Sequence, residues 1–498
     1  MSALPRTVPS RLRPLPAMLL VALLAMLNFV VGIGQPGKPV WDESYYLTST
    51  QRYEQGIAQF ASHPPLGLML IATGDALLRP NRGTAVRTLG WDKRVKGEEL
   101  PAAFSLQGVR LASGVFAVVG AVAFFCLMLT LTQRTIAALA FSNLYVFENA
   151  FIVHFRAAHL DAFQLAFSVC ALLCIAISVQ RRQRGWPWLE FAFGLFCGLA
   201  TMVKLNAGVL MLLGAMLIAW RAGKGWRIAP QRRLLMTAAR DSAAMAAGCA
   251  LAIVAVFAAH VAAGPNPPDT RSPAGMQDVR FVSGDYRAYL DGGRPLSPAV
   301  VLAAARGYAD FMAADFAGMA RSDPNASPPL QWPLHRKTIN YRWDSDGVRT
   351  GYVQLSGNLF SWSLALLSPV AALCLLLLQW RRPLPGGWTP RRVLMAMLLL
   401  QYLAFMAVHA WLGTQRVMYL YHYFIGLLLA FCLIPLVLEE SARRWRVLRA
   451  NNTPLLASMT VLLLGSFVFY SPLTFHRPLT HAECERRNLF QQVVECRP

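Results

Sequence analysis

The chain has 498 residues, of which 55% are hydrophobic and only 14% are charged. This composition excludes an ordinary soluble globular protein and indicates a membrane protein. The formal net charge is +22, but most of the excess basic residues stand between apolar segments, so they report on membrane orientation rather than on a nucleic-acid partner. The sequence has no glycine-rich phosphate loop, zinc-type cysteine spacing or dinucleotide fingerprint, which disfavours soluble cofactor enzymes.

Apolar stretches of spanning or near-spanning length recur along the chain, and a crossing needs about 20 residues. The first is expected to be an uncleaved helix, because it is long enough to span and no small-residue cleavage site follows it. The sequence therefore predicts an all-α integral membrane protein of about eleven transmembrane helices. The stretches lie at 15–34, 108–132, 135–153, 159–179, 189–203, 206–220, 242–263, 358–380, 393–412, 419–437 and 454–471.

Clusters of arginine and lysine mark the loops on one side, at 181–184, 221–240, 381–392 and 443–449. The positive-inside rule assigns them, with the basic N-terminus, to the cytoplasm. Two crossings must separate the first two clusters, so Lys204 is expected at a turn on the opposite face. The predicted regions are a transmembrane module at 1–263 containing a first outer loop at 35–107, a second outer loop at 264–357, C-terminal transmembrane helices at 358–471 and an outer tail at 472–498.

The outer segments carry the polar residues that need an explanation. Asp42 and Glu43 follow the first span by about one turn, where they could simply solvate the end of the helix. His63 precedes Pro64 and Pro65, which are expected to form a rigid turn into a second apolar helix along the membrane surface.

Further charged and aromatic residues are predicted at the same boundary. Charges near a membrane are costly and usually mark a functional site or an ion pair, although a single cation can also be a snorkelling anchor. Two acids with several cations suit a lipid-borne phosphate substrate, because cations can hold the phosphate while a carboxylate works beside it. These residues are Arg156 and Asp161 between the third and fourth spans, Lys204 after the fifth, and Arg416, Tyr421 and His422 at the tenth.

Seven of the nine cysteines fall in apolar stretches, where a thiol packs as a small hydrophobic group. The other two, Cys484 and Cys496, lie in the polar outer tail. A disulfide between them is predicted, and it would require an oxidising compartment.

With these residues in order along the chain, the sequence resembles the protein O-mannosyltransferase family of the GT-C superfamily, whose members use polyprenyl-phosphate sugars. Two positions depart from the family pattern, since Leu68 stands where Lys is usual and Glu148 where Asp is usual. The second outer loop is also too short for the β-trefoil domain of eukaryotic members. The matching pieces are Asp42-Glu43, His63 to Gly67, Glu148 to Ala150, Arg156, Leu160-Asp161, Gly198 to Lys204, Ser327 to Pro333, Gly357-Asn358 and Tyr421 to Tyr423.

The resemblance implies a GT-C fold with a catalytic module in the first 263 residues. It also implies an inverting transfer of a sugar to a hydroxyl of an extracytoplasmic acceptor, and mannose is the sugar that it favours. It makes Asp42 the candidate general base. Glu43 is expected beside it in the catalytic pair, either orienting the acceptor or stabilising the helix. Candidate donor-phosphate or substrate contacts are His63, Arg156, Lys204, Arg416, Tyr421 and His422, and candidate structural residues are Pro64, Pro65, Asp161 and Asn358.

The expected partners are membrane lipid, a polyprenyl-phosphate sugar and a protein or glycan acceptor, with no nucleic acid, no metal and no cofactor beyond the lipid-linked donor. The expected acceptor is a protein serine or threonine. The expected location is a bacterial inner membrane, with the site on the periplasmic face. One alternative is a transferase that adds an aminosugar or another sugar to lipid A or an envelope glycan. An alternative of another class is a lipid-linked-sugar flippase or transporter, although those proteins tend to place polar groups near the midplane of internal repeats.

Overall fold

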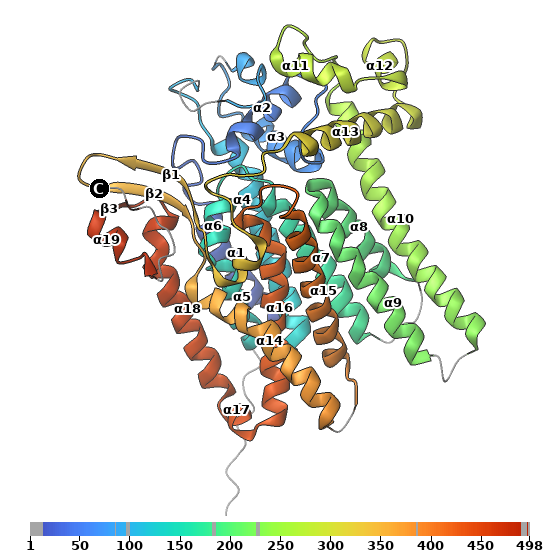
Figure 1. Cartoon of the computed structure of the whole chain (residues 1–498), viewed down its shortest axis with the longest axis vertical. Helices are drawn as coiled ribbons and strands as arrows, with labels where there is room; N and C mark the ends of the chain where they lie inside the picture. Colours follow the sequence, from blue (N-terminus) through green and yellow to red (C-terminus); the bar gives the residue numbers. More distant parts are fainter. Residues whose placement is uncertain are drawn as a thin grey trace, which may run out of the picture.

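The computed structural model describes residues 13–84, 86–95, 100–181, 186–225, 230–384, 387–489 and 496. The basic N-terminus at 1–12 and parts of the basic loops at 182–185, 226–229 and 385–386 lie outside the described residues. The rest is dominated by a bundle of long apolar helices, with most of the shorter helices and a small sheet towards one end of it (Figure 1).

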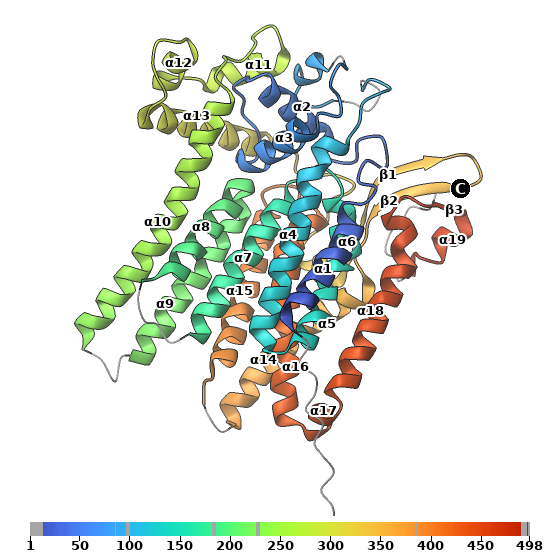
Figure 2. The ribbon, with the colours of Figure 1, turned by 180° about the vertical axis from the view of Figure 1, so that it is seen from behind.

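Every predicted apolar stretch coincides with a helix or a pair of helices. By length and composition alone, eight could cross a membrane, and a ninth span is formed if the bent pair α5 and α6 is counted as one. The helices α1 and α8 are shorter, and Figure 2 shows α1 lying against α4 on the reverse face. The helices of the bundle are α1 (Pro14–Phe29), α4 (Gln107–Thr132), α5 (Thr135–Val146), α6 (Asn149–Phe155), α7 (Asp161–Gln180), α8 (Trp188–Val203), α9 (Met211–Gly225), α10 (Gln231–Ala263), α14 (Leu359–Arg381), α15 (Pro390–Leu412), α16 (Phe424–Arg444) and α18 (Asn452–Thr474).

The bend of 57° between α5 and α6 is built around the buried carboxylate of Glu148. This side chain accepts hydrogen bonds from the backbone N–H of Asn358 at 2.8 Å and from the indole of Trp362 at 3.0 Å. Asn358 in turn donates to the carbonyls of Phe147 and Leu463, so it joins the broken span to α14 and α18. A buried polar group is tolerated only when it is hydrogen-bonded, which explains why an acid can stand inside an apolar stretch.

The first outer loop forms α2 (Glu43–Glu54), the 3-10 helix η1 (Arg87–Gly90) and the apolar helix α3 (Leu66–Leu78), which begins after Pro65 and packs on α4. The same end of the bundle carries the helices of the second outer loop (Figure 1). The remaining helices are α11 (Pro273–Asp278), η4 (Val279–Phe281), α12 (Gly284–Leu290), α13 (Pro298–Gly318), η5 (Pro329–Leu334), η3 (Leu205–Leu210), η6 (Leu420–Tyr423), α17 (Arg446–Ala450) and α19 (His481–Glu485).

A three-stranded antiparallel sheet departs from the expectation of an all-α chain. The hairpin β1 (Ile339–Ser345) and β2 (Thr350–Leu355) comes from the second outer loop, and β3 (Pro478–Leu479) comes from the tail. Thr350 pairs with Leu479, so the pairing joins segments more than a hundred residues apart, which local sequence patterns do not reveal. The tail is closed by a disulfide between Cys484 and Cys496.

The two ends of the bundle differ in charge, which leads to a prediction about orientation. In a variant that keeps only Cys484 and Cys496, single cysteines at Ser62, Asn206 and Gly413 should react with a membrane-impermeant thiol reagent on intact cells. A cysteine at Asn451, at the opposite end in the α17 connection, should react only after permeabilisation, because the basic loops are retained in the cytoplasm. Protection of Asn206 until permeabilisation would contradict the hairpin of α8 and α9.

Candidate active site

Asp42 stands where the first outer loop turns into α2. Trp41 before it has a left-handed backbone (φ 49°), and its ring stacks on Tyr341 with ring centres 5.2 Å apart. The Tyr421 hydroxyl donates to Asp42 Oδ2 at 3.3 Å. Burial raises the pKa of Asp42 to about 6, against the opposing effect of the nearby Lys204 ammonium. A carboxylate with this pKa is suited to accept a proton near neutral pH.

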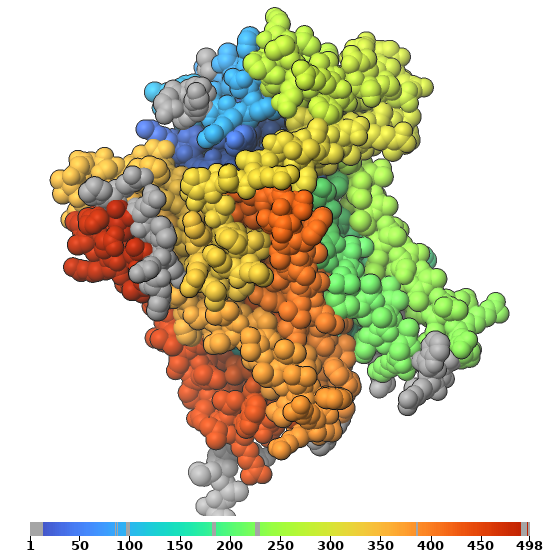
Figure 3. Space-filling model, in the orientation of Figure 1, coloured from blue at the N-terminus to red at the C-terminus, as the bar shows by residue number. Residues whose placement is uncertain are grey.

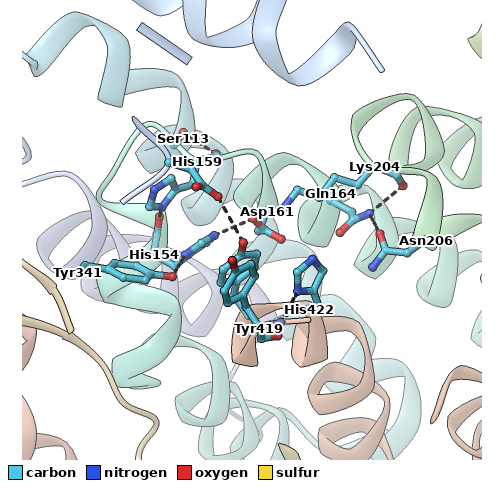
Figure 4. A network of polar contacts seen from close by, with 12 residues as sticks. Ser113, His154, His159, Asp161, Gln164, Lys204, Asn206, Tyr341, Tyr419 and His422 are labelled. Carbon is cyan, nitrogen blue, oxygen red and sulfur yellow. Dashed lines mark hydrogen bonds and ion pairs between the residues drawn. The ribbon is translucent and has the colours of Figure 1, made fainter. Parts of the chain in front are cut away.

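Lys204 is held by a buried ion pair. Its Nζ donates to Asp161 Oδ2 at 2.7 Å, and the same oxygen lies 2.7 Å from His154 Nε2. The other ring nitrogen of His154 lies 2.7 Å from the hydroxyl of Tyr341, which belongs to β1. Figure 4 shows this chain of contacts crossing the site from the sheet towards α8. Asp161, which the sequence predicted as structural, therefore lies inside the site.

The turn after α8 is fixed by α7. Lys204 follows the last residue of α8 with an extended backbone, so its side chain leaves the helix at the outer end. Gln164 of α7 donates to the backbone carbonyl of Lys204 at 2.9 Å and to the Asn206 side chain at 2.8 Å (Figure 4). These bonds orient the turn, and the Lys204 ammonium lies 5.1 Å from the centre of the Tyr421 ring. Lys204 thus contacts the tyrosine that bonds Asp42.

A cavity of about 860 Å³ opens beside Lys204. Four of the predicted donor-binding residues line it: Lys204, His63, Arg416 and His422. The remainder of its wall is mostly apolar and comes largely from η3, α13 and α15, through residues such as Val209, Met312, Phe316, Val408 and Leu412. The cavity joins cations to an apolar wall, which is the pairing that a phosphate on a hydrocarbon chain needs.

Each of the other three predicted donor-binding residues in this cavity has a defined position. The backbone N–H of Tyr419 donates to His422 Nδ1 at 3.0 Å, and the Arg416 guanidinium lies 5.9 Å from the centre of the Phe316 ring in α13. Tyr308 of α13 bonds the carbonyl of His63 at 2.9 Å, which fixes the turn formed by the two prolines. Burial and the nearby cations lower the pKa of His63 to about 3, so it is a neutral hydrogen-bonding group at physiological pH.

Glu43 follows Asp42 in the sequence, but its carboxylate is held by other partners. Its two carboxylate oxygens accept four hydrogen bonds of 2.7–2.8 Å, from Nε and Nη2 of Arg110 and from the backbone N–H groups of Val40 and Ala158. The side chain is fully buried. These contacts saturate the carboxylate, so we expect Glu43 to stabilise the helix, which is the second of its two predicted roles.

Arg110 was missed by the sequence analysis. It is buried in α4 and also donates to the carbonyls of Ile33, Pro36 and Lys38, which fixes the loop that leads to Asp42. Its position inside a predicted span could have indicated a functional or structural role, because a charge within a membrane span usually has a charged or polar partner.

Arg156 is not brought together with the other predicted phosphate contacts. Its guanidinium donates to the carbonyls of Asn28, Val31 and Gly32 at 2.8–3.0 Å, where α1 ends. It lines a separate cavity of about 240 Å³ with Arg110 and does not border the cavity beside Lys204. The geometry makes Arg156 a cap for the end of α1, where backbone carbonyls lack helical partners.

The described residues contain no group of three or more His, Cys, Asp or Glu side chains placed to hold a metal ion. Asp42 and Glu43 are adjacent in sequence, but their carboxylates bond Tyr421 and Arg110 respectively and do not share a ligand position.

Comparisons with known proteins identify the family of the chain. A family model described as dolichyl-phosphate-mannose-protein mannosyltransferase matches residues 19–255. A second model, for the C-terminal four-transmembrane region of protein O-mannosyltransferase, matches residues 310–493. The chain therefore belongs to the protein O-mannosyltransferase family of GT-C membrane proteins.

Individual relatives are distant. The chain is 24% identical over 196 residues to dolichyl-phosphate-mannose–protein mannosyltransferase 4 of Schizosaccharomyces pombe and 28% identical over 200 residues to mannosyltransferase 3 of Saccharomyces cerevisiae. These matches take in 37% and 38% of this chain but only 24% of each relative's length. A solved structure of the S. cerevisiae protein O-mannosyltransferase Pmt1-Pmt2 complex bound to the sugar donor has a TM-score of 0.77 at 13% identity, covering 98% of this chain and 93% of that one, which shows a shared fold.

The different positions of Arg156 and Arg416 predict different effects of their loss. Arg156→Met should lower the free energy of unfolding in detergent by about 2–4 kcal/mol, and with it the melting temperature, because three carbonyls lose a charged donor. The donor KM of the folded protein should be unchanged. Arg416→Gln should keep the melting temperature and raise the donor KM by roughly 10-fold or more, because Arg416 is predicted to make a charge-assisted contact with the donor phosphate. Thermal unfolding and steady-state kinetics measure both quantities. An unchanged melting temperature with a raised KM in Arg156→Met would return Arg156 to the site.

Proposed function

We propose that the chain is an inverting glycosyltransferase that moves mannose from a polyprenyl-phosphate donor to a serine or threonine hydroxyl of an extracytoplasmic protein. The observation that carries the proposal is the juxtaposition at Lys204, which contacts Asp161 and the Tyr421 ring on one side and lines the cation-bearing apolar cavity on the other. The family supports the mannose donor and the protein acceptor, as do the names of the two yeast relatives.

The donor's two chemical parts match two parts of the cavity. Lys204 and Arg416 supply positive charge for the phosphate, while His63 and His422 supply hydrogen-bonding nitrogens. The apolar wall from α13 and α15 suits the isoprenoid chain, because the free energy of an apolar chain is lower against apolar side chains than in water or among polar headgroups. The phosphate is then held at the outer end of the bundle, next to the tyrosine that bonds Asp42.

Asp42 is the proposed general base. The acceptor hydroxyl attacks the anomeric carbon and passes its proton to the Asp42 carboxylate as the new C–O bond forms. The bond between the anomeric carbon and the phosphate oxygen breaks on the opposite face, which inverts the configuration. The leaving phosphate is a weak base that Lys204 and Arg416 can stabilise, so a general acid is not required.

We place the enzyme in a bacterial inner membrane with this site at the periplasmic face. Two observations support the orientation. The basic connections of α17 lie at the end of the bundle opposite to α2, which Asp42 directly precedes, as the positive-inside rule expects of cytoplasmic loops (Figure 1). The disulfide between Cys484 and Cys496 closes the tail whose strand β3 pairs with β2, in the same sheet as Tyr341 of the site, and it suits an oxidising compartment.

Replacing Asp42 tests the mechanism. Asp42→Asn should lower kcat by about 10²- to 10⁴-fold with an unchanged melting temperature, because the amide cannot accept the proton. In the wild type, kcat/KM should fall as the pH drops through about 6, because the raised pKa of Asp42 leaves the base protonated below that value. Asp42→Glu should retain measurable activity, and its kcat/KM should also fall at low pH, because a carboxylate is still the base. Near-normal turnover of Asp42→Asn would exclude Asp42 as the base.

The substrates are tested by incubating purified protein with radiolabelled polyprenyl-phosphate sugars and membrane fractions. Polyprenyl-phosphate mannose should transfer label to protein, and mild alkali should release it, since the bond is to a serine or threonine hydroxyl. The same rate is expected in excess chelator, because the cations of the cavity are side chains. Label found only in lipid A or envelope glycan would show that the acceptor is not a protein. Movement of intact donor across the membrane would favour a transporter. Loss of activity in chelator that divalent metal restores would overturn metal independence.

A further inference from the structure

A second apolar cavity lies between the C-terminal helices and shares no lining residue with the first. It is a groove of about 280 Å³ bordered by α14, α16 and α18, and we refer to it as the α14–α18 groove. It runs from Phe360, near the start of α14, to Leu448 in α17. Apart from three serines, the lining is apolar and includes Leu364, Leu438 and Leu455.

The groove opens to the membrane rather than to the interior of the protein. Leu367 and Leu462, which line it, keep 61% and 54% of their side chains exposed. Figure 3 shows this face, where the surface of α18 adjoins that of α14. Because the bilayer surrounds this part of the chain, a hydrocarbon chain is the natural occupant of the space.

Four arginines stand at the end of the groove, where α16 passes into α17. Arg449 donates to the carbonyls of Ala442 and Arg443, which folds α17 back against the end of α16. Arg444 donates to Gln379 of α14 at 2.7 Å. Arg443 and Arg446 are exposed. Ser441 and Leu448 line the groove within this same short segment, so the arginines lie at its mouth.

These arginines are not neutralised by the protein. The two nearby acids are engaged elsewhere, since Glu440 pairs with Arg392 at 2.9 Å and Glu439 pairs with Arg134 and Arg391. Within the described parts of the chain, no ion pair joins an acidic side chain to any of the four arginines. The mouth therefore holds an excess of positive charge beside an apolar channel.

We infer that the α14–α18 groove is a binding site for an anionic phospholipid of the leaflet next to the basic loops. One acyl chain lies in the groove, and the phosphate is held by Arg443 and Arg446. Guanidinium groups match phosphate oxygens in a bidentate geometry, and basic residues close to a membrane favour anionic headgroups. Any lipid can cover apolar helices, but only an anionic one also satisfies the charge at the mouth.

This site is independent of the donor cavity and does not rest on the proposed function. The lipid would connect α18 to α14 and α16 along the half of the bundle where the groove separates them, so bound lipid should stabilise the C-terminal helices. A polar link between α14 and α18, the hydrogen bond from Asn358 to the Leu463 carbonyl, lies at the other end of the groove.

The test is native mass spectrometry of the full-length protein in detergent, with phosphatidylglycerol or phosphatidylcholine added. Phosphatidylglycerol should bind preferentially and raise the melting temperature. Arg443→Gln with Arg446→Gln should weaken its binding by about 10-fold or more, since each cation contributes separately. The matched control is Arg232→Gln with Arg233→Gln, two exposed arginines at the start of α10, which should change binding little.

A second pair of variants tests the groove itself. Ser458→Trp fills it and should abolish the preference for phosphatidylglycerol, whereas Val461→Trp, 67% exposed on α18 outside the groove lining, should not. Equal binding of the two lipids by the wild type would overturn the inference. So would equal losses in the arginine pair and its control, or an unchanged preference in Ser458→Trp.

Discussion

The site depends on one buried ion pair, between Lys204 and Asp161. Asp161 lies in the first turn of α7, where the helix dipole favours a negative charge. Its carboxylate fixes the Lys204 ammonium between Asp42 and the large cavity, and its contact with His154 extends the network to Tyr341 in the sheet. Removing one partner of such a pair costs about 3–5 kcal/mol, because a charge is left buried without compensation. The same contact therefore stabilises the fold and positions the cation.

The bilayer explains why the polar groups are arranged as networks. A carboxylate away from water must find several donors or it becomes neutral. Glu148 finds them by breaking the span between α5 and α6, and Glu43 finds them in Arg110 and two backbone N–H groups. Both acids are saturated by the protein. Asp42 differs, because Tyr421 is its one direct hydrogen-bond donor among the described residues, which leaves it able to bond a substrate hydroxyl.

Hydrophobic length and charge bias predicted the helices and their order, because both effects are local in sequence. They also placed His63, Lys204, Arg416 and His422 on one face, and the structure brings these four into one cavity. The sequence did not separate Arg156 from that set. Its partners are the carbonyls at the end of α1, and their position depends on how α1 packs against α6 rather than on any motif.

Two further features were beyond a sequence pattern for the same reason. The sheet joins the second outer loop to the tail, and the Glu43–Arg110 pair joins residues 67 positions apart. Each is a tertiary contact between segments that look unremarkable alone. The charge of Arg110 within a span did signal that it has a buried partner, but which acid it pairs with could be seen only in the structure.

The most direct measurement is an experimental structure of the chain with a non-transferable polyprenyl-phosphate mannose analogue. The phosphate should lie in the large cavity within hydrogen-bonding distance of Lys204, with the anomeric carbon turned towards Asp42 and the isoprenoid chain along α13 and α15. A phosphate bound instead in the smaller cavity against Arg156, with Lys204 still paired only to Asp161, would contradict the assignment of the active site.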